Sequence, residues 1–356
     1  MAVGRGKTTN MSDEELKKIY EARKAKIKVI GVGGAGNNTV TRLMQTGVVG
    51  IESIAINTDA QDLLYTDSDK KILIGKEITG GLGAGADPKI GEEAAKENKE
   101  EIKKVLQDAD MVFITCGLGG GTGTGASPII ADIAKKMGIL TVGIATMPFS
   151  MEGYQRITNA KMGLEKLLPI VDTMIIIPND KLLEVVPDVS VPTAFRIADE
   201  ILVNSVKGIT ELITKPGLIN LDFADVRSVM TNGGLAMIGM GESDSEDRAR
   251  EVVERALNNP LLDVDIDEGK AALINIAGGP DITIKECQEI VQAISPRLSN
   301  TAKVIWGAQV EKELGDTVRV LVVITGVKQP QFFISEKAEK TKRRKEIEKM
   351  LDIEFI

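Results

Sequence analysis

The sequence contains no histidine, and this absence removes several kinds of chemistry. It excludes catalysis by a Ser–His or Cys–His pair in its usual form, and it removes the commonest side-chain ligand of transition metals. The two cysteines, Cys116 and Cys287, lie far apart without a CxxC motif, which indicates a reducing cytoplasm rather than a disulfide framework. Any reaction must therefore depend on carboxylates, amides, hydroxyls, Lys, Arg or a hard cation such as Mg²⁺.

Long apolar segments and an excess of positive charge are also missing. No uninterrupted apolar run is long enough to span a membrane, so direct membrane insertion is not expected. The N-terminus lacks the apolar core of a secretory signal, which favours a cytoplasmic location. The formal net charge of −8 argues against a general affinity for nucleic acid.

A glycine-rich segment, 117–125, is the most informative feature that is present. It holds six glycines in nine residues, follows the apolar run Met111–Thr115 and precedes a helical pattern that starts at Pro128. A strand, a glycine loop and a helix in this order allow backbone N–H groups and a helix N-terminus to hold a phosphate. No Lys follows the last glycine, so the segment is not a Walker P-loop. Cys116 beside it is predicted to be a small buried core residue rather than a nucleophile.

Two further glycine loops accompany this segment. Gly31, Gly33 and Gly36 form a G-x-G-x-x-G motif after a predicted strand, with Asp59 near the end of the next one. This is the dinucleotide-binding fingerprint, so a nicotinamide or flavin enzyme is a real alternative. The third loop, 80–86, could close over a γ-phosphate. Two phosphate loops at successive strand ends fit a nucleotide with a long phosphate chain better than a dinucleotide.

The order of predicted elements indicates two folded units in the 356 residues. Alternating strands and helices predict a doubly wound, mostly parallel α/β sheet, and a long central helix (Pro192–Thr214) leads into an α+β domain with a mixed sheet. We divide the chain into an N-terminal extension (1–25), a nucleotide-binding domain (26–191), the central helix with the start of a catalytic loop (192–220), a C-terminal α+β domain (221–327) and a charged tail (328–356).

Local patterns predict several element boundaries. Capping boxes are expected at Ser12–Glu15 and at Ser243–Glu246, the second before a helix that ends near Leu257. Asp87-Pro88 should open one helix whose apolar positions run to Leu106. In the second half we expect a helix at Ile284–Ile294 and strands at Ala272–Ile276, Val304–Trp306 and Val318–Thr325.

Several polar residues are candidates for chemistry. Asp222 and Asp225 lie three apart after Asn220, so one helical turn would place both carboxylates on one face to polarise a water or hold a cation's hydration shell. The same spacing also fits a helix cap. Asp199 lies among apolar neighbours and needs a partner or a ligand, and a carboxylate matches the N1–H and N2–H donors of guanine. Two more candidates are Asn179, which follows a strand, and the pair Glu152 and Arg156, which could be a simple helix-face ion pair.

Together these motifs resemble the tubulin/FtsZ superfamily of polymerising GTPases, and most closely its archaeal FtsZ members. The segment 117–125 carries the GGGTGTG signature, and 220–226 matches the NxDFADV loop. The segments 31–38, 57–60, 81–88, 178–179 and 232–239 also resemble the family's sequences, so the resemblance covers about residues 26–327. Ala198 departs from it, because many bacterial members carry Asn there.

The resemblance implies a role for each matching residue. It places the α- and β-phosphates beside Gly33, Gly34, Asn37 and Asn38, and the γ-phosphate beside Gly83, Ala84 and Gly85. It implies a phosphate cradle made of Gly120, Gly121, Thr122, Gly123 and Thr124. It implies ribose and phosphate contacts from Glu152 and Arg156, and base contacts from Asn179, Phe195 and Asp199.

The resemblance also implies the biology. The ligands would be GTP and GDP, with Mg²⁺ held through the GTP phosphates and water. Asp222, Asp225 and Asn220 would reach the GTP of the next subunit, so that hydrolysis accompanies head-to-tail polymerisation into a septal ring at mid-cell. The segment Leu351–Ile356 would dock on a membrane-tethering adaptor. A relative that binds GTP without hydrolysing it remains an alternative.

Overall fold

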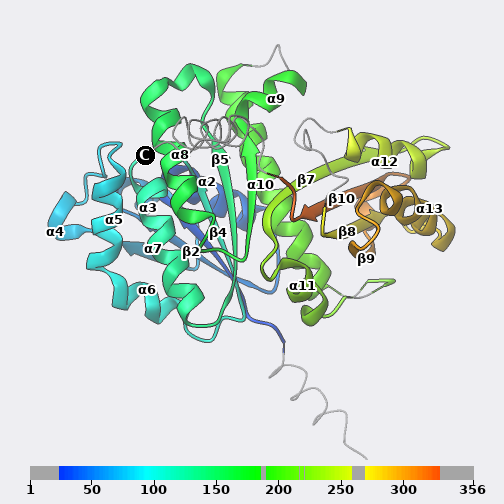
Figure 1. Ribbon diagram of the computed structural model, residues 1–356, viewed down its shortest axis with the longest axis horizontal. Helices are drawn as coiled ribbons and strands as arrows, with labels where there is room; N and C mark the ends of the chain where they lie inside the picture. Colours follow the sequence, from blue (N-terminus) through cyan, green and yellow to red (C-terminus); the bar gives the residue numbers. More distant parts are fainter. Residues whose placement is uncertain (1–23, 186–189, 216, 220, 259–268, 329–356) are drawn as a thin grey trace, which may run out of the picture.

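The computed structural model describes residues 24–185, 190–215, 217–219, 221–258 and 269–328 (Figure 1). The expected capping box at Ser12–Glu15, the candidate Asn220 and the predicted charged tail lie outside the described residues.

The described strands form one ten-stranded sheet, in the order β3-β2-β1-β4-β5-β6-β7-β10-β8-β9. Pairing is parallel from β3 to β7 and between β8 and β9, whereas β10 runs antiparallel to both β7 and β8. The strands are β1 (Ile27–Val32), β2 (Ile51–Asn57), β3 (Lys70–Leu73), β4 (Met111–Gly117), β5 (Leu140–Met147), β6 (Thr173–Pro178), β7 (Gly234–Ser243), β8 (Ala271–Gly278), β9 (Lys303–Val310) and β10 (Val318–Thr325).

Helices cover both faces of this sheet. They are α2 (Gly33–Gln45), α3 (Ala60–Tyr65), α4 (Lys76–Thr79), α5 (Pro88–Glu97), α6 (Lys99–Leu106), α7 (Thr122–Lys136), α8 (Tyr154–Leu167), α9 (Asn179–Val185), α10 (Val191–Thr214), α11 (Phe223–Met230), α12 (Arg248–Leu257) and α13 (Ile284–Ile294). Short 3₁₀ turns lie at η1 (Ser150–Glu152), η4 (Ser295–Arg297) and η5 (Lys312–Leu314). The predicted fold class is confirmed.

Two apolar cores explain the three layers. Helices α5 to α8, α12 and α13 pack on one face of the sheet, and α2, α10 and α11 pack on the other. Successive strand residues alternate between the cores: Val29 lies in one and Ile30 in the other. Strands that are apolar on both sides are what a sheet covered on both faces requires.

The central helix joins the two halves. Figure 1 shows α10 passing through the middle of the molecule, between the blue-to-green strands and the yellow-to-red ones. Its buried residues Val206, Ile209 and Leu212 share a core with Phe113 of β4 and Leu273 of β8. The helix has 24 residues, which corresponds to a length of about 36 Å.

Three local predictions were wrong. The segment 88–106 forms two helices rather than one, because Asn98 ends α5 and its Oδ1 accepts a hydrogen bond from the Gly75 N–H at 2.9 Å. Ser243 does not cap α12; it ends β7, and its hydroxyl binds Glu251. Separate sheets were expected for the two halves, yet β6 and β7 pair over Thr173–Ile175 and Gly234–Ala236 and make one sheet.

Strand β7 was not predicted from the sequence, because it contains several glycines, which have a low strand propensity. Gly234, Gly239 and Gly241 weaken the pattern of this ten-residue strand. Gly241 is required by packing, since a Cβ there would lie 2.3 Å from the carbonyl oxygen of Val252 on α12.

Candidate functional site

Most of the predicted nucleotide residues surround one cavity at the carboxyl edge of the parallel strands. β1 and β4 are neighbours although β2 and β3 lie on the other side of β1, so the strand order changes direction here. Ligands of open α/β sheets bind at such a point. The cavity has a volume of about 290 Å³, and the predicted residues in its wall are Gly33, Gly34, Gly120, Gly121, Thr122, Gly123, Glu152, Arg156, Asn179, Phe195 and Asp199.

Close backbone packing brings the three glycine loops together. Gly33 has a φ of +70°, and a Cβ there would lie 2.9 Å from the backbone nitrogen of Gly123. A Cβ on Gly121 would lie 2.7 Å from the Cβ of Ala84, so the loop with Gly83, Ala84 and Gly85 packs against the glycine-rich segment 117–125. Side chains at these contacts would push the loops apart.

Two other glycines face open space instead. A Cβ on Gly120 would meet no atom within 4 Å, and one on Gly34 would meet only Asp62, at 3.9 Å. Both residues line the cavity. Their lack of side chains leaves a hollow walled by backbone, which is the shape that a phosphate group requires.

The threonines of the loop hold its conformation. The Thr122 hydroxyl shares a hydrogen bond of 2.7 Å with the hydroxyl of Thr58, which follows β2. The Thr124 hydroxyl accepts from the Gly119 N–H at 2.8 Å, and Thr124 is not part of the cavity wall. Backbone N–H groups at the start of α7 have no acceptor within the helix and are therefore expected to be donors to a ligand.

The two asparagines after the first glycine loop lie outside the cavity wall. Asn37 is fully buried, and its Nδ2 donates to Asp62 Oδ2 at 2.7 Å. Asn57 donates to the same oxygen at the same distance, so Asp62 fastens α2 to the end of β2. Asn38 is exposed on α2. Direct phosphate contact by these two side chains remains a prediction.

An ion pair and two aromatic rings form one side of the cavity. Glu152 Oε2 lies 2.6 Å from Arg156 Nη1, and its Oε1 accepts from the Phe149 N–H at 2.8 Å. Phe195 meets Phe149 edge to face, with ring centroids 5.0 Å apart, and remains partly exposed. Its exposed ring offers an apolar surface for a flat base.

The two polar side chains that were predicted to contact a base, Asn179 and Asp199, both line the cavity. Asn179 is 4% exposed, and its Oδ1 has no hydrogen-bond partner in the described structure. A buried acceptor without a partner is costly unless a ligand donor reaches it. Asp199 Oδ2 lies 3.2 Å from Arg42 Nε. Burial raises the pKa of the Asp199 carboxyl to about 6, although Arg42 acts in the opposite direction.

The acidic pair lies at the other end of α10. Asp222 Oδ1 accepts from the Asp225 N–H at 2.8 Å, and Asp225 Oδ2 accepts from the Asp222 N–H at 3.4 Å, which makes a capping box for α11. Neither residue lines the cavity. The helix rises by about 22 Å over the 15 steps from Asp199 to Thr214. One chain therefore cannot bring these carboxylates to its own cavity, and Figure 1 shows α9 near the upper edge of the molecule and α11 near its lower edge.

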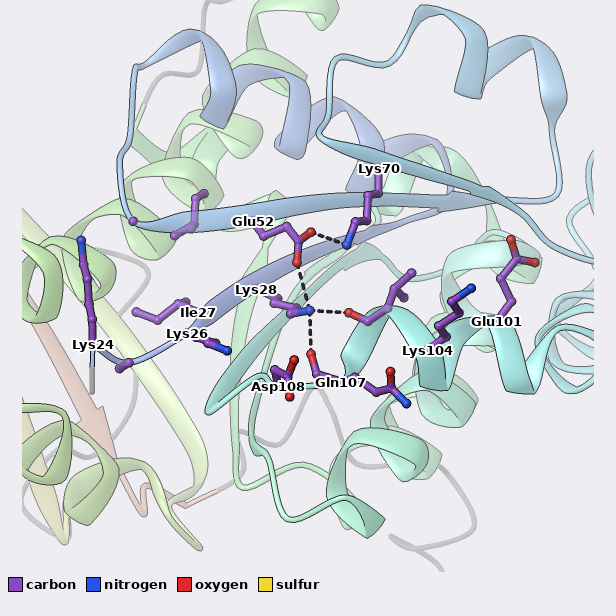
Figure 2. Close-up of a pocket in the computed structure, with 14 residues that line it drawn as sticks. Lys24, Lys26, Ile27, Lys28, Glu52, Lys70, Glu101, Lys104, Gln107 and Asp108 are labelled. Atoms are coloured by element: carbon purple, nitrogen blue, oxygen red, sulfur yellow. Dashed lines mark hydrogen bonds and ion pairs between the residues drawn. The ribbon is translucent and has the colours of Figure 1, made fainter. Parts of the chain in front are cut away.

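A larger cavity of about 780 Å³ lies where β1 and β2 begin (Figure 2). The Lys28 ammonium in its wall donates to the carbonyls of Val105 and Gln107 and pairs with Glu52 at 2.9 Å. Lys70 binds the same carboxylate. Burial raises the pKa of Glu52, but hydrogen bonds from Lys70 and Lys28 outweigh it and lower the pKa overall. Lys28 and Lys70 thus share one carboxylate, and none of the predicted site residues lines this cavity.

Some neighbours of the site escaped prediction. Arg42 belongs to no recognisable motif, and it lies beside Asp199 only because α2 and α10 pack together. Asp62 and Asn57 belong to the second predicted strand region and its following turn. Asp62 accepts hydrogen bonds from Asn57 and from Asn37 of α2, and this arrangement depends on the pairing of β1 with β2. Cys116 is fully buried, and burial raises the pKa of its thiol to about 11, so it is a core residue as predicted.

Comparison with known proteins decides the family. A family model for the GTPase domain of the tubulin/FtsZ family matches residues 26–187, and one for the C-terminal domain of the FtsZ family matches 234–328. Cell division protein FtsZ 1 of Thermococcus kodakarensis is 60% identical over 333 residues, which are 94% of this chain and 89% of the relative. The chain belongs to the FtsZ family. The resemblance inferred from the motifs is confirmed, and the alternative of a nicotinamide or flavin enzyme is wrong.

Further FtsZ relatives agree with this assignment. FtsZ 1 of Pyrococcus furiosus is 63% identical over 315 residues, 88% of this chain and 84% of the relative. A solved FtsZ dimer from M. jannaschii superimposes with a TM-score of 0.84 at 59% identity, covering 89% of this chain and 93% of that one. CetZ1 from Haloferax volcanii shares the fold, with a TM-score of 0.78 at 22% identity. The chain is therefore a tubulin-like GTPase of a cell division family.

Proposed function

We propose that this GTPase binds GTP in the 290 Å³ cavity and hydrolyses it when Asp222 and Asp225 of a second copy reach the γ-phosphate. The separation of the cavity from the acidic pair along α10 is the observation that carries this proposal. Each junction between subunits then completes one active site. The subunits assemble head to tail, and because such a contact does not close on itself it builds a filament.

The glycine loops support binding of a phosphate chain. In this proposal the first turn of α2, with Gly33 and Gly34, holds the α- and β-phosphates, while the first turn of α7 holds them from below. The loop with Gly83, Ala84 and Gly85 lies beside the γ-phosphate. Backbone N–H groups donate to the phosphate oxygens, and the positive ends of the helix dipoles favour the negative charge. The open space at Gly34 and Gly120 fits this role.

The opposite side of the cavity suits guanosine. Asp199 accepts from the N1–H and N2–H donors of guanine, and the unpaired Asn179 Oδ1 accepts another donor from the nucleotide. Phe195 packs on the base. Glu152 and Arg156, already paired, turn toward the ribose and the neighbouring phosphates. Adenine lacks the pair of donors that Asp199 would require.

The carboxylates of the second copy supply the rest of the chemistry. Asp222 and Asp225, at the exposed N-terminus of α11, accept hydrogen bonds from a water and orient it toward the γ-phosphate. Mg²⁺ bound through the GTP phosphates and water would neutralise charge as the bond to the β-phosphate breaks. Within the described residues, no group of three or more His, Cys, Asp or Glu side chains is placed to hold a metal ion directly.

Exposed apolar residues support association between the two ends. Leu82, Met151 and Tyr154 belong to segments beside the cavity and are 88%, 72% and 78% exposed. Leu218, four residues before Asp222, is 54% exposed. Large apolar side chains that protrude near both half-sites are typical of a surface that a partner covers.

The cellular part of the proposal is a filament of the division ring at mid-cell. Among the described residues no helix has the length and apolar character needed to cross a membrane. We propose that Leu351–Ile356, which lies outside the described residues, docks on a membrane-bound adaptor. Deleting these six residues should abolish co-sedimentation with adaptor-bearing vesicles while GTP turnover persists. Undiminished binding by the truncated chain would refute this docking role.

The pKa of Asp199 predicts how guanine nucleotide affinity depends on pH. The acceptor is the ionised carboxylate, so binding weakens as the pH falls through about 6 in the free protein. Between pH 7 and pH 5 the Kd for GDP should rise about tenfold, following the fraction of ionised carboxyl. Titration calorimetry of wild type and Asp199→Asn at both pH values measures this. The variant should bind more weakly at pH 7 and lose most of the pH dependence; the same steep dependence in both proteins would show that another group is responsible.

Replacing Asp222 by Asn tests the catalytic role. Asn caps a helix as well as Asp does, so α11 should stay intact while the carboxylate charge is lost. We expect GTP binding and sedimentation of polymer to persist and kcat to fall by about 10²- to 10⁴-fold. Phosphate release and sedimentation measured in parallel separate catalysis from assembly.

A matched control lies in the same half of the chain. Thr283 and Glu286 form a capping box on α13 like that of Asp222 and Asp225 on α11. Thr283→Ala should weaken the helix without affecting kcat. Wild-type turnover by Asp222→Asn, or a wild-type rate strictly proportional to protein concentration, would contradict hydrolysis at a junction between subunits.

A further inference from the structure

Asn159 on α8 links two of the glycine loops, although it does not line the nucleotide cavity. Its side chain is buried, at 2% exposure. The Nδ2 group donates to the carbonyl of Ala86 at 3.1 Å and to that of Gly119 at 3.4 Å, while Oδ1 accepts from Gln155 Nε2 at 3.1 Å. One amide thus joins the loop that contains Gly83–Gly85 to the start of segment 117–125.

The backbone at Ala86 explains why this loop needs an anchor. Ala86 has a φ of +61°, in the left-handed region that residues with a Cβ avoid. Such a conformation persists only where the surroundings hold it, and it is often found at functional sites. The hydrogen bond from Asn159 acts directly on the carbonyl of this residue. The same turn continues to Asp87, whose N–H donates to the Ala84 carbonyl at 3.0 Å.

The second acceptor of Asn159 is also tightly placed. Gly119 has a φ of +106°, and a Cβ there would lie 2.9 Å from the carbonyl oxygen of Arg156, one turn before Asn159. The Gly119 N–H is bound by Thr124. Helix α8 therefore contributes Arg156 to the cavity wall and Asn159 to both loops. A shift of the amide would weaken the hydrogen bond to the strained Ala86.

We propose that Asn159 is a positioning residue for recognition of the γ-phosphate. It holds the left-handed turn at Ala86 and thereby keeps the loop against segment 117–125, where Ala84 packs on Gly121. This inference rests on the proposed function, in which that loop lies beside the γ-phosphate. A ligand with a γ-phosphate depends on the anchored loop. GDP depends mainly on the segments after β1 and β4, which Asn159 contacts only through the longer bond of 3.4 Å to Gly119.

Affinities for GTPγS and GDP, measured by calorimetry below the concentration at which polymer forms, test this role. Asn159→Leu keeps the size of the side chain but removes both donors. It should weaken GTPγS binding about tenfold, the usual cost of a lost buried hydrogen bond, and GDP binding about twofold or less. The matched control is Asn275→Leu, because buried Asn275 donates to the Gly208 carbonyl at 3.0 Å far from the loops. The control should leave the GTPγS-to-GDP ratio unchanged.

A second substitution distinguishes positioning from general stability. Glycine adopts positive φ freely, so adding Ala86→Gly to Asn159→Leu should restore most of the GTPγS affinity. If Asn159→Leu does not fold, Ala86→Val in the otherwise wild-type chain should reproduce the selective loss from the loop side. Equal losses for both nucleotides, an unchanged ratio, or no rescue by glycine would overturn the inference. Absence of guanine nucleotide binding by the wild-type protein would instead overturn the proposed function.

Discussion

The burial of α10 between the two halves of the sheet is the constraint on which the rest of the structure depends. Leu212 and its neighbours pack against strands of both halves, so the helix cannot bend or slide without opening a core. One end of this rigid element carries Asp199 into the cavity, and the other leads to the acidic cap of α11. In the proposed function, the fixed distance between them makes GTP hydrolysis a property of two copies rather than one.

Glycine backbone, without side chains, forms much of the cavity wall. Gly33, Gly121 and Gly123 let backbones approach each other, whereas Gly34 and Gly120 leave room for a ligand. The parallel pairing of β1 with β4 brings two of the loops together, and α8 anchors the third through Asn159. The phosphate site proposed for this cavity needs neither His nor a Walker Lys, which agrees with the composition of the chain.

Much of the fold and of the candidate site could be predicted from motifs with fixed spacing. A glycine loop between a strand and a helix is recognisable because all of its residues are close together in the sequence. The fold class, the central helix and the family followed from such patterns. Contacts between distant segments did not: Arg42 beside Asp199, Asp62 between α2 and β2, and the pairing of β6 with β7 depend on tertiary packing. Asn37 illustrates the limit, since the motif predicts a phosphate contact but gives no sign that the side chain also donates to Asp62.

Mixing two inactive variants tests the shared active site most directly. Gly120→Trp fills the cavity but keeps Asp222, and Asp222→Asn keeps the cavity but lacks the carboxylate. Each should be inactive alone, while an equal mixture forms some junctions in which an intact cavity meets an intact Asp222. The account predicts GTP turnover up to about a quarter of the wild-type rate, the share of such junctions in random head-to-tail assembly. Turnover of the mixture no greater than the sum of the separate variants would contradict it.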